Sequence, residues 1–486
     1  MQLLKEYGSY INGEFVYGEK SFPCINPANG KTIAQIRGAD AKIVDNAVSA
    51  ARNAFQTFGK TTRVERANLL RAMADRMEQN SEYLAKAECL DTGKPLGEAC
   101  IHVGCCVEMY RYFAAAIEAR EETGICHDNG SISLVVREPL GVAGLIVAWN
   151  CPPMLLAWKL APALAMGNTV VIKPSASAVV GIMEAIRIWD DILPKGVVNV
   201  VLGAGKEIGD QITNHPGISK LSFTGSVEMG RKIGAIAGER IIPATLELGG
   251  KSAAVIFDDA NLERALQKTL IGILSSAGEV CVANARVLVQ DTVYDRFLSM
   301  LKEKFEGAVI GDPMDAGTQI GAVINEAHME KVLAYIETGK KEGAALICGG
   351  GRYTENGCAD GYFIQPTLFG DVKNTMTIAK EEIFGPVLCV MKFTDEADAL
   401  RQANDSVYGL GAAVWTENIH RAIRMGRGLE AGMVWINDYL DCAAGNPFGG
   451  YKSSGLGREV NQMALDHYSQ VKNICISDDE GVPMVW

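Results

Sequence analysis

The sequence predicts an α/β protein in which a doubly wound, nucleotide-type domain is followed by a second α/β domain. The first observation is a regular alternation of apolar strands and helical segments from Val142 onward, at the spacing of βαβ units. Such units form a parallel sheet that helices cover on both faces. The second observation is that the alternation restarts after Gly250. We therefore expect the second domain to span about 251–450.

Length and composition restrict the class of protein. A chain of 486 residues suggests several domains. Apolar residues make up 48% and charged residues 21%, which is typical of globular proteins and favours neither disorder nor a membrane class. The formal net charge is −12 and no basic run occurs. We therefore expect no nucleic-acid partner, because such binding requires clustered Lys and Arg.

The ends and the cysteines indicate a cytoplasmic protein. The first seven residues lack the basic and apolar regions of a secretory signal. The longest apolar stretches, 142–149 and 154–166, are interrupted and too short to span a bilayer. The 13 cysteines contain no CxxC pair, and the six histidines show no paired spacing. This pattern fits a reducing compartment, and we expect no metal centre.

The individual elements follow from periodicity. Helical spacing runs from Asp40 to about Cys89, and a further helix is expected over 96–119. Short β-prone pieces lie over 9–16. The remaining predicted strands cover 134–138, 142–149, 169–172, 197–201, 220–223, 252–257 and 285–289, and the remaining helices end near 166, 191, 275 and 305. Residues 470–486 alternate in part like an exposed strand, which favours pairing with another subunit.

The stretch around Cys281 is the best candidate for chemistry. Cys281 follows Gly278 and precedes an apolar strand, a position typical of a nucleophile that faces a substrate. Glu247 lies shortly before the glycine pair 249–250. A thiol nucleophile needs a base, either to form the thiolate or to activate the water that later releases the product. Glu247 is the best candidate base. The alternative is that Cys281 is an inert buried thiol.

Two further sites in the sequence, Gly225 with Ser226 and Lys173, are typical of phosphate or ribose binding. Gly225 and Ser226 follow a strand and open a helix, where glycine allows close approach and the helix N-terminus stabilises negative charge. A simple tight turn is the alternative. Lys173 ends an apolar strand at the carboxyl edge of the sheet, where open α/β folds bind ligands. The alternative for Lys173 is a solvated charge.

Asn150 stands at the end of a buried strand, close to two prolines. Its amide could donate to an oxyanion together with the backbone N–H of Cys281. An ordinary turn asparagine is the alternative. Glu382, ahead of Phe384, could hold sugar hydroxyls while the ring packs against a cofactor.

Together these residues resemble the aldehyde dehydrogenase superfamily, in the family's order and over nearly the whole chain. The motifs are WNxP at 149–152, KPS at 173–175, FTGS at 223–226, ELGGK at 247–251, GxxC at 278–281, EEIFGPV at 381–387 and PFGGYKxSG at 447–455. The resemblance implies a Rossmann-like cofactor domain, a catalytic domain and a small β oligomerisation element. The implied boundaries are 1–121 with 140–250, then 251–450, and 122–139 with 468–486.

The resemblance also implies roles. Cys281 attacks an aldehyde, the Asn150 amide and the Cys281 N–H hold the oxyanion, hydride passes to the nicotinamide, and Glu247 activates water to hydrolyse the thioester. The implied catalytic residues are Cys281, Glu247, Asn150 and Lys173. The implied cofactor, NAD or NADP, is contacted by Trp149, Lys173, Ser175, Ala176, Gly205, Gly225, Ser226, Leu248, Glu382 and Phe384. The implied partner is a small aldehyde, and the implied assembly is a homodimer or homotetramer.

The chain departs from the family pattern in several places. Ala176 replaces a glutamate that bonds the adenine ribose in many NAD-preferring members, so the choice between NAD and NADP stays open. Glu279 replaces a glutamine, and we expect it to point away from Cys281 because a facing carboxylate would raise the thiol pKa. A roomier, partly polar pocket is expected from the residues at its lining positions: Trp158, Leu274, Ser275, Asp441 and Cys442.

Two alternatives to a hydrolytic aldehyde dehydrogenase remain from the sequence. Acylating members that release a coenzyme-A ester share the pattern but usually lack the carboxylate at the position of Glu247. A non-catalytic binding protein of the same fold would have no need for Cys281, Glu247 and Asn150 together. Hydrolysis to the free acid is therefore favoured.

Overall fold

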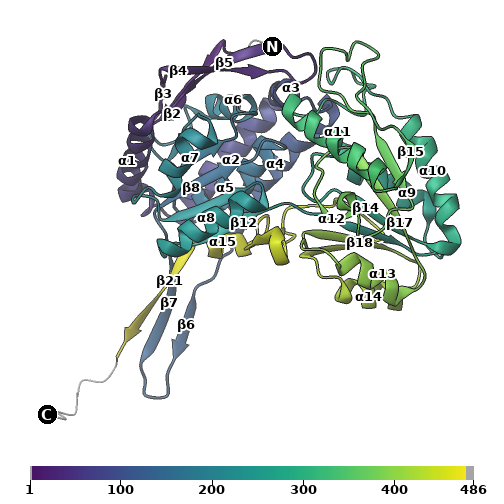
Figure 1. Cartoon of the computed structure of the whole chain (residues 1–486). Coiled ribbons are helices and arrows are strands. Elements are labelled where there is room, and N and C mark those ends of the chain that lie inside the picture. Colours follow the sequence, from purple (N-terminus) through teal and green to yellow (C-terminus); the bar gives the residue numbers. More distant parts are fainter. Residues whose placement is uncertain (1–2, 478–486) are drawn as a thin grey trace.

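The chain is described by a computed structural model that covers residues 3–477, and its largest sheet lies in the N-terminal half (Figure 1). The central strands are parallel, and short antiparallel strands flank them on both sides. In spatial order the strands are β20 (Gly455–Leu456), β12 (Ala244–Glu247), β11 (Lys220–Thr224), β8 (Val142–Val147), β9 (Thr169–Pro174), β10 (Val198–Val200), β2 (Ser9–Ile11) and β3 (Glu14–Val16). The predicted parallel sheet is confirmed.

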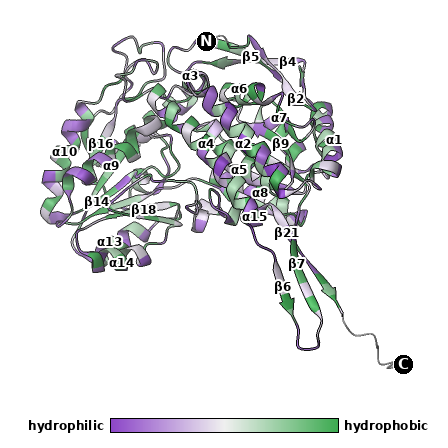
Figure 2. Ribbon diagram, turned by 180° about the vertical axis from the view of Figure 1, so that it is seen from behind, coloured by the Kyte–Doolittle hydropathy of each residue, from purple (hydrophilic) through white to green (hydrophobic). Residues whose placement is uncertain are grey.

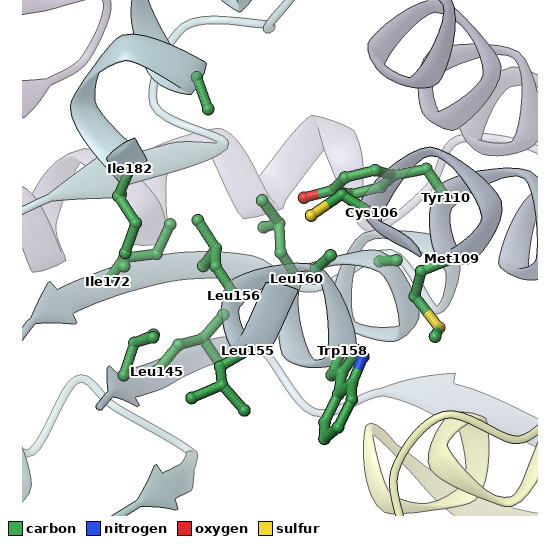
Figure 3. Close-up of a cluster of buried hydrophobic side chains, with 14 of the residues drawn as sticks. Cys106, Met109, Tyr110, Leu145, Leu155, Leu156, Trp158, Leu160, Ile172 and Ile182 are labelled. Atoms are coloured by element: carbon green, nitrogen blue, oxygen red, sulfur yellow. The ribbon is translucent and has the colours of Figure 1, made fainter. Parts of the chain in front are cut away.

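Helices cover both faces of this sheet, as continuous apolar strands require. One face packs against α1 (Ala41–Phe58), α7 (Gly205–Thr213) and α8 (Val227–Glu239). On the other face, α5 (Pro152–Ala165) and α6 (Val180–Trp189) pack against the sheet. A further layer, formed by α2 (Arg63–Gln79), α3 (Ser81–Thr92) and α4 (Leu96–Glu118), packs on these two helices. Figure 3 shows this second core, where leucines of α5 lie between strand residues Leu145 and Ile172 and the side chains of α4.

The helical run predicted from Asp40 to Cys89 is divided into the separate helices α1, α2 and α3. Gly59 ends α1, and Thr62 begins α2 through a capping box with Glu65. Asn80 then separates α2 from α3. These caps satisfy backbone groups that the helix ends would otherwise leave unpaired.

A second sheet forms after residue 250. Its order is β15 (Ala345–Cys348), β16 (Thr367–Gly370), β17 (Val387–Phe393), β14 (Arg286–Gln290), β13 (Ala253–Ile256), β18 (Gly411–Trp415) and β19 (Met433–Ile436). Side chains alternate along β13, so Ala253 and Val255 face one core and Ala254 and Ile256 face the other. The helices around the sheet are α9 (Leu262–Leu274), α10 (Tyr294–Glu306), α11 (Glu326–Lys341), α12 (Thr377–Lys380), α13 (Glu396–Asn404) and α14 (Ile419–Gly428).

A long antiparallel ribbon projects from the rest of the chain in both views (Figures 1 and 2). It consists of β6 (Thr123–Cys126), β7 (Ile132–Pro139) and β21 (Ser469–Ile476), with β7 in the centre. Its exposed apolar side chains are Ile125, Ile132, Leu134, Val471, Ile474 and Ile476. The predicted C-terminal strand is thus present as β21, whereas its predicted extension over 478–486 lies outside the described residues.

The remaining elements are small. Strands β1 (Glu6–Tyr7), β5 (Thr32–Gly38) and β4 (Lys20–Ile25) form a separate sheet, and α15 (Met463–His467) precedes β21. Within residues 3–477, no helix has the length and apolar character needed to cross a membrane.

The parallel register brings the predicted site residues to one edge of the first sheet. Val147 of β8 pairs with Pro174 of β9, and Thr224 of β11 pairs with Glu247 of β12. The segments that follow these strands therefore leave the sheet at its carboxyl edge, where open α/β sheets bind ligands.

Candidate active site

Cys281 follows a strained turn that connects α9 to β14. The three residues Ser276, Ala277 and Gly278 have φ angles of 47°, 51° and 78°, all in the left-handed region. Residues other than glycine pay roughly 1–3 kcal/mol each for this conformation. The carboxylate of Glu98 holds the turn, because its Oε2 accepts hydrogen bonds from the backbone N of Ser276 at 2.7 Å and from its Oγ at 2.9 Å.

Gly278 is required by space as well as by conformation. A Cβ atom added there would lie 2.2 Å from the carbonyl oxygen of Gly385. The turn can therefore pack against this segment only with glycine at position 278, and this close packing sets where Cys281 stands.

Cys281 lies between two cavities. A cavity of about 280 Å³ extends toward the carboxyl edge of the first sheet. A second cavity, of about 410 Å³, opens between α4, α5 and the loop around Cys442. Cys281 and Asn150 line both cavities. A thiol in this position can meet two molecules at once, one from each side.

Asn150 is fixed beside the Cys281 loop. Its Nδ2 donates a 3.0 Å hydrogen bond to the backbone oxygen of Glu279. Its own backbone oxygen accepts a 2.6 Å hydrogen bond from Nζ of the buried Lys94. The side-chain amide is thereby oriented near the thiol, with its second N–H proton still available for a negatively charged oxygen.

Glu279 does not pair with the thiol. Its Oε1 accepts a 2.9 Å hydrogen bond from the backbone N of Ile324 and lies 3.6 Å from Nε2 of His328. Burial raises the pKa of this carboxyl group well above its usual range. Glu279 therefore anchors the loop before α11, in line with the expectation that it points away from Cys281.

Glu247 ends β12 and lines the same cavity as Cys281 on the side of the first sheet. It is buried, and neither carboxylate oxygen has a hydrogen-bond partner among the described residues. Burial, assisted by the negative charge of Glu459, raises the pKa of Glu247 well above its usual range. A carboxylate with this pKa and two free oxygens is suited to accept a proton from water.

The thiol itself is held neutral in this environment. Burial raises the pKa of Cys281 well above that of a free thiol, and the nearby negative charges of Cys151 and Glu247 raise it further. Ionisation of Cys281 therefore requires a proton acceptor or a ligand that changes the surroundings.

The smaller cavity suits a dinucleotide. Six predicted cofactor residues line it: Trp149, Gly225, Ser226, Leu248, Glu382 and Phe384. The rings of Trp149 and Phe384 meet edge to face at 5.4 Å, and Glu382 accepts a 2.9 Å hydrogen bond from the backbone N of Gly250. The buried Thr224 Oγ1 has no hydrogen-bond partner among the described residues, and Ser226 opens α8 toward the cavity. Orphaned polar groups and a helix N-terminus together fit a phosphate-bearing ligand.

Sequence reasoning missed two residues of this cavity, His328 and Lys331. Both belong to α11, and the ring of His328 packs at 5.3 Å against Trp149. No motif surrounds either residue, so the sequence contained no local signal for them.

The other predicted cofactor residues lie outside the lining of this cavity: Lys173, Ser175, Ala176 and Gly205. Lys173 ends β9 at the same edge of the sheet, in register with Ile146 of β8. Burial lowers its pKa to about 8, and its Nζ donates a 3.2 Å hydrogen bond to the backbone oxygen of Pro174.

The larger cavity is mostly apolar with acidic groups at intervals. Predicted pocket residues Trp158, Ser275, Asp441 and Cys442 line it, with Phe448 against Trp158. Leu274 instead lines an adjacent surface groove with Leu270 and Glu303. Polar and ionisable residues that line this cavity without having been predicted include Glu98, His102, Glu108 and Cys151.

Comparison with known proteins identifies the family. The model of the aldehyde dehydrogenase family matches residues 15–474. An aldehyde dehydrogenase of Deinococcus radiodurans is 44% identical, and the match covers 97% of this chain and 93% of the relative. The structure of betaine aldehyde dehydrogenase from Staphylococcus aureus in complex with NAD+ superposes with a TM-score of 0.97 at 36% identity, covering 100% of this chain and 97% of that one. An NAD+ complex of an aldehyde dehydrogenase from Bacillus cereus gives a TM-score of 0.95 at 40% identity, with 98% and 97% covered. This chain therefore belongs to the aldehyde dehydrogenase family and is an NAD(P)-dependent oxidoreductase that oxidises aldehydes.

Proposed function

We propose that Cys281 is the nucleophile of this aldehyde dehydrogenase, with Asn150 as oxyanion donor and Glu247 as general base. The observation that carries the proposal is that Cys281 and Asn150 line both cavities. The aldehyde enters the larger cavity, and the nicotinamide end of the cofactor enters the smaller one. Glu247 lies on the cofactor side of the thiol.

In the first step, the Cys281 thiol loses its proton to solvent, and the sulfur then attacks the aldehyde carbon and forms a thiohemiacetal. Negative charge develops on the former carbonyl oxygen, and the Asn150 Nδ2–H and the Cys281 N–H stabilise it. Because the amide of Asn150 is already oriented by its bond to Glu279, little reorganisation is needed when this charge appears.

A nicotinamide held in the smaller cavity would supply the hydride acceptor, so that loss of hydride from the thiohemiacetal carbon would leave a thioester on Cys281. Glu247 then removes a proton from water, which attacks the thioester and releases the carboxylic acid. The raised pKa of Glu247 makes it a stronger base than an exposed carboxylate.

The cofactor is held in this proposal by the residues of the smaller cavity together with Lys173, Ser175, Ala176 and Gly205. The rings of Trp149 and Phe384 flank the nicotinamide end, and Glu382 and Lys173 bind ribose hydroxyls. Ala176 has no carboxylate that would repel the 2′-phosphate of NADP, so both NADP and NAD are candidate cofactors.

The proposed domains follow the two large sheets. Residues 1–121 and 140–250 bind the cofactor, residues 251–450 carry Cys281, and residues 122–139 with 468–486 form the oligomerisation element. The exposed apolar side chains of β6, β7 and β21 support pairing between copies as a homodimer or homotetramer. We place the enzyme in the cytoplasm because its scattered cysteines fit a reducing compartment.

The test is an assay of the purified protein with aliphatic, aromatic and cationic aldehydes, betaine aldehyde included, and with NAD or NADP in turn. Cofactor reduction that is absent in Cys281→Ala would support the proposal. Reduction that persists in Cys281→Ala would refute the role of the thiol. Coenzyme A is added in a parallel series, and formation of an acyl-coenzyme A instead of the free acid would favour the acylating alternative.

A further inference from the structure

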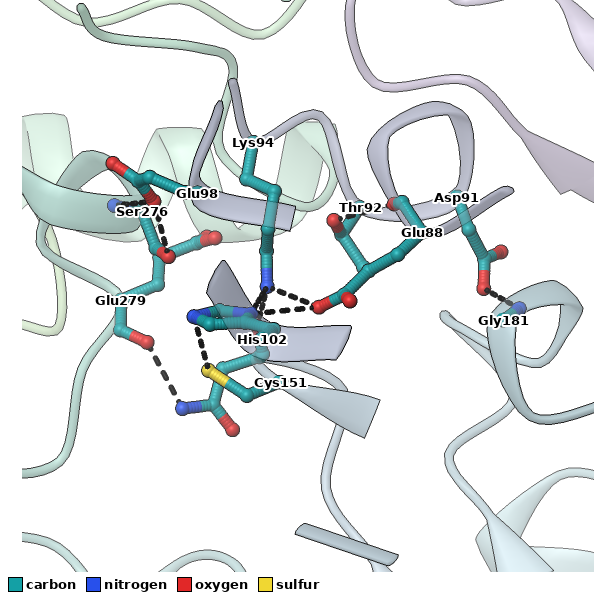
Figure 4. Close-up of polar contacts among 11 residues, drawn as sticks. Glu88, Asp91, Thr92, Lys94, Glu98, His102, Cys151, Gly181, Ser276 and Glu279 are labelled. Carbon is teal, nitrogen blue, oxygen red and sulfur yellow. Dashed lines mark hydrogen bonds and ion pairs between the residues drawn. The ribbon is translucent and has the colours of Figure 1, made fainter. Parts of the chain in front are cut away.

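A second thiol in the larger cavity has a histidine and a carboxylate beside it. Cys151 stands immediately before α5, and its Sγ lies 4.0 Å from Nε2 of His102 on α4 (Figure 4). The other ring nitrogen of His102, Nδ1, lies 2.9 Å from Oε1 of the fully buried Glu88 on α3. A thiol, an imidazole and a carboxylate are thus aligned in the order that activates a cysteine nucleophile.

The cluster is fixed from a further side by Lys94. Its Nζ donates 2.8 Å and 2.6 Å hydrogen bonds to Glu88 Oε1 and to the backbone oxygen of Asn150, the residue next to Cys151. Within residues 3–477, no group of His, Cys, Asp or Glu side chains is arranged to hold a metal ion. The contacts of Lys94 hold Glu88 and the segment before Cys151 in place.

The charges around Cys151 favour the thiolate. Burial raises its pKa, but the positive charges of Lys94 and His102 outweigh this effect, so the pKa of Cys151 is lowered from that of a free thiol. The other thiols of the cavity behave in the opposite way: burial raises the pKa values of Cys105, Cys281 and Cys442. Thiolates react with soft electrophiles, whereas neutral thiols react poorly.

We propose that Cys151 is a second nucleophile of the substrate cavity and a site of covalent modification by α,β-unsaturated aldehydes. The positions of His102 and Glu88 indicate that Cys151 is the nucleophile. The electrophile is expected to be an aldehyde because the cavity that Cys151 lines is the proposed aldehyde site. The choice of this class rests on the function proposed above, whereas the reactivity of Cys151 does not.

The reaction is a conjugate addition that needs no oxidant. The Cys151 sulfur forms a bond to the β-carbon, the C=C π bond breaks, and its electrons pass to the α-carbon. The proton that the thiol gave to His102 on ionisation is returned to the α-carbon. The product is a thioether that keeps its aldehyde group, and it occupies the cavity that Cys281 also lines. Modification of Cys151 therefore blocks access of further aldehyde to Cys281.

The experiment incubates the full-length protein with trans-2-butenal at neutral pH without cofactor, so that no turnover occurs. Borohydride then reduces the aldehyde of any adduct, and digestion with mass spectrometry locates the modified cysteine. We expect the adduct on Cys151, in the wild-type chain and equally in Cys281→Ala. An adduct confined to other cysteines, or one that reaches Cys151 only after denaturation, would overturn the proposal.

A kinetic measurement gives an independent result. Inactivation by trans-2-butenal, expressed relative to each variant's own starting rate, should slow at least tenfold in Cys151→Ser. Cys105→Ser is the matched control, because Cys105 lines the same cavity and no histidine of residues 3–477 forms a hydrogen bond with it. This variant should inactivate like the wild type. His102→Gln should slow adduct formation at Cys151 while the thermal unfolding midpoint shows that it remains folded. Equal inactivation in Cys151→Ser and wild type would contradict the proposal. The adduct on Cys151 can be mapped even if the protein oxidises no aldehyde. Failure of the proposed dehydrogenase activity and failure of the proposed Cys151 reactivity can therefore be distinguished.

Discussion

The substitution Gly278→Ala tests how the turn presents Cys281. The added Cβ would lie 2.2 Å from the Gly385 oxygen, whereas real Cβ contacts are essentially never below 3.0 Å. The turn must therefore move by about 0.8 Å, the difference between these two distances. The φ of 78° costs alanine a further ~1–2 kcal/mol.

A displacement of this size next to the nucleophile should lower kcat/KM by about 10²-fold, because misplacement by about 1 Å has that effect on catalytic geometry. This corresponds to about 2.7 kcal/mol of transition-state stabilisation. The assay is the initial rate of cofactor reduction with a good aldehyde, together with circular dichroism at the assay temperature to show that the variant is folded.

Gly238→Ala is the matched control. It makes the same chemical change in α8, where a Cβ would come within 4 Å of no atom of the described residues beyond its own turn of helix, and it should leave kcat/KM unchanged. If folded Gly278→Ala kept kcat/KM within twofold of the wild type, the close packing of the turn would not govern the position of the thiol.

Further predictions concern the base, the oxyanion donor and the cofactor. Glu247→Gln should lower the steady-state rate by roughly 10² to 10⁴ because thioester hydrolysis loses its base, while a stopped-flow burst of reduced cofactor persists; loss of the burst would contradict this role. In the wild type the steady-state rate should rise with pH on the alkaline side of neutrality, since Cys281 and Glu247 have raised pKa values and each must lose a proton to act. A rate that falls over this range would refute the roles of Cys281 as nucleophile and Glu247 as base. Asn150→Ala should slow the hydride step by roughly 10² to 10³. A larger kinetic isotope effect with deuterated aldehyde would report this change, and an unchanged rate would exclude the oxyanion role of Asn150. Cofactor binding to Cys281→Ala should weaken as the pH rises through about 8, because the pKa of Lys173 is lowered to about 8 and the lysine loses its charge there. Binding is measured by fluorescence titration, and the same pH dependence in Lys173→Ala would show that another group is responsible.

The features that the sequence predicted well are those with a strong local signal. Strands β8 and β9 are continuous apolar runs, and their buried positions required a sheet covered on both faces. Trp149, Ser226 and Glu382 each lie in a short motif, and the structure brings all three to one cavity. The division of the first helical run was also readable in principle, since Thr62 and Glu65 have the spacing of a capping box.

The features that the sequence did not predict depend on packing between distant segments. Glu98 reaches the turn before Cys281 from a helix 178 residues away in the chain. His102 and Cys151 meet across 49 residues. His328 joins Trp149 only because α11 packs beside the cofactor cavity. A periodic pattern indicates which face of a helix is buried, but not which distant element covers it.

The central claim is that Cys281 carries the acyl intermediate. The most direct test mixes Glu247→Gln with aldehyde and NAD or NADP, quenches in acid and maps the acyl group by mass spectrometry. We expect a stable thioester on the peptide that contains Cys281, and no thioester when the cofactor is omitted. An acyl group on any other residue, or none despite a burst of reduced cofactor, would show that Cys281 does not carry the intermediate.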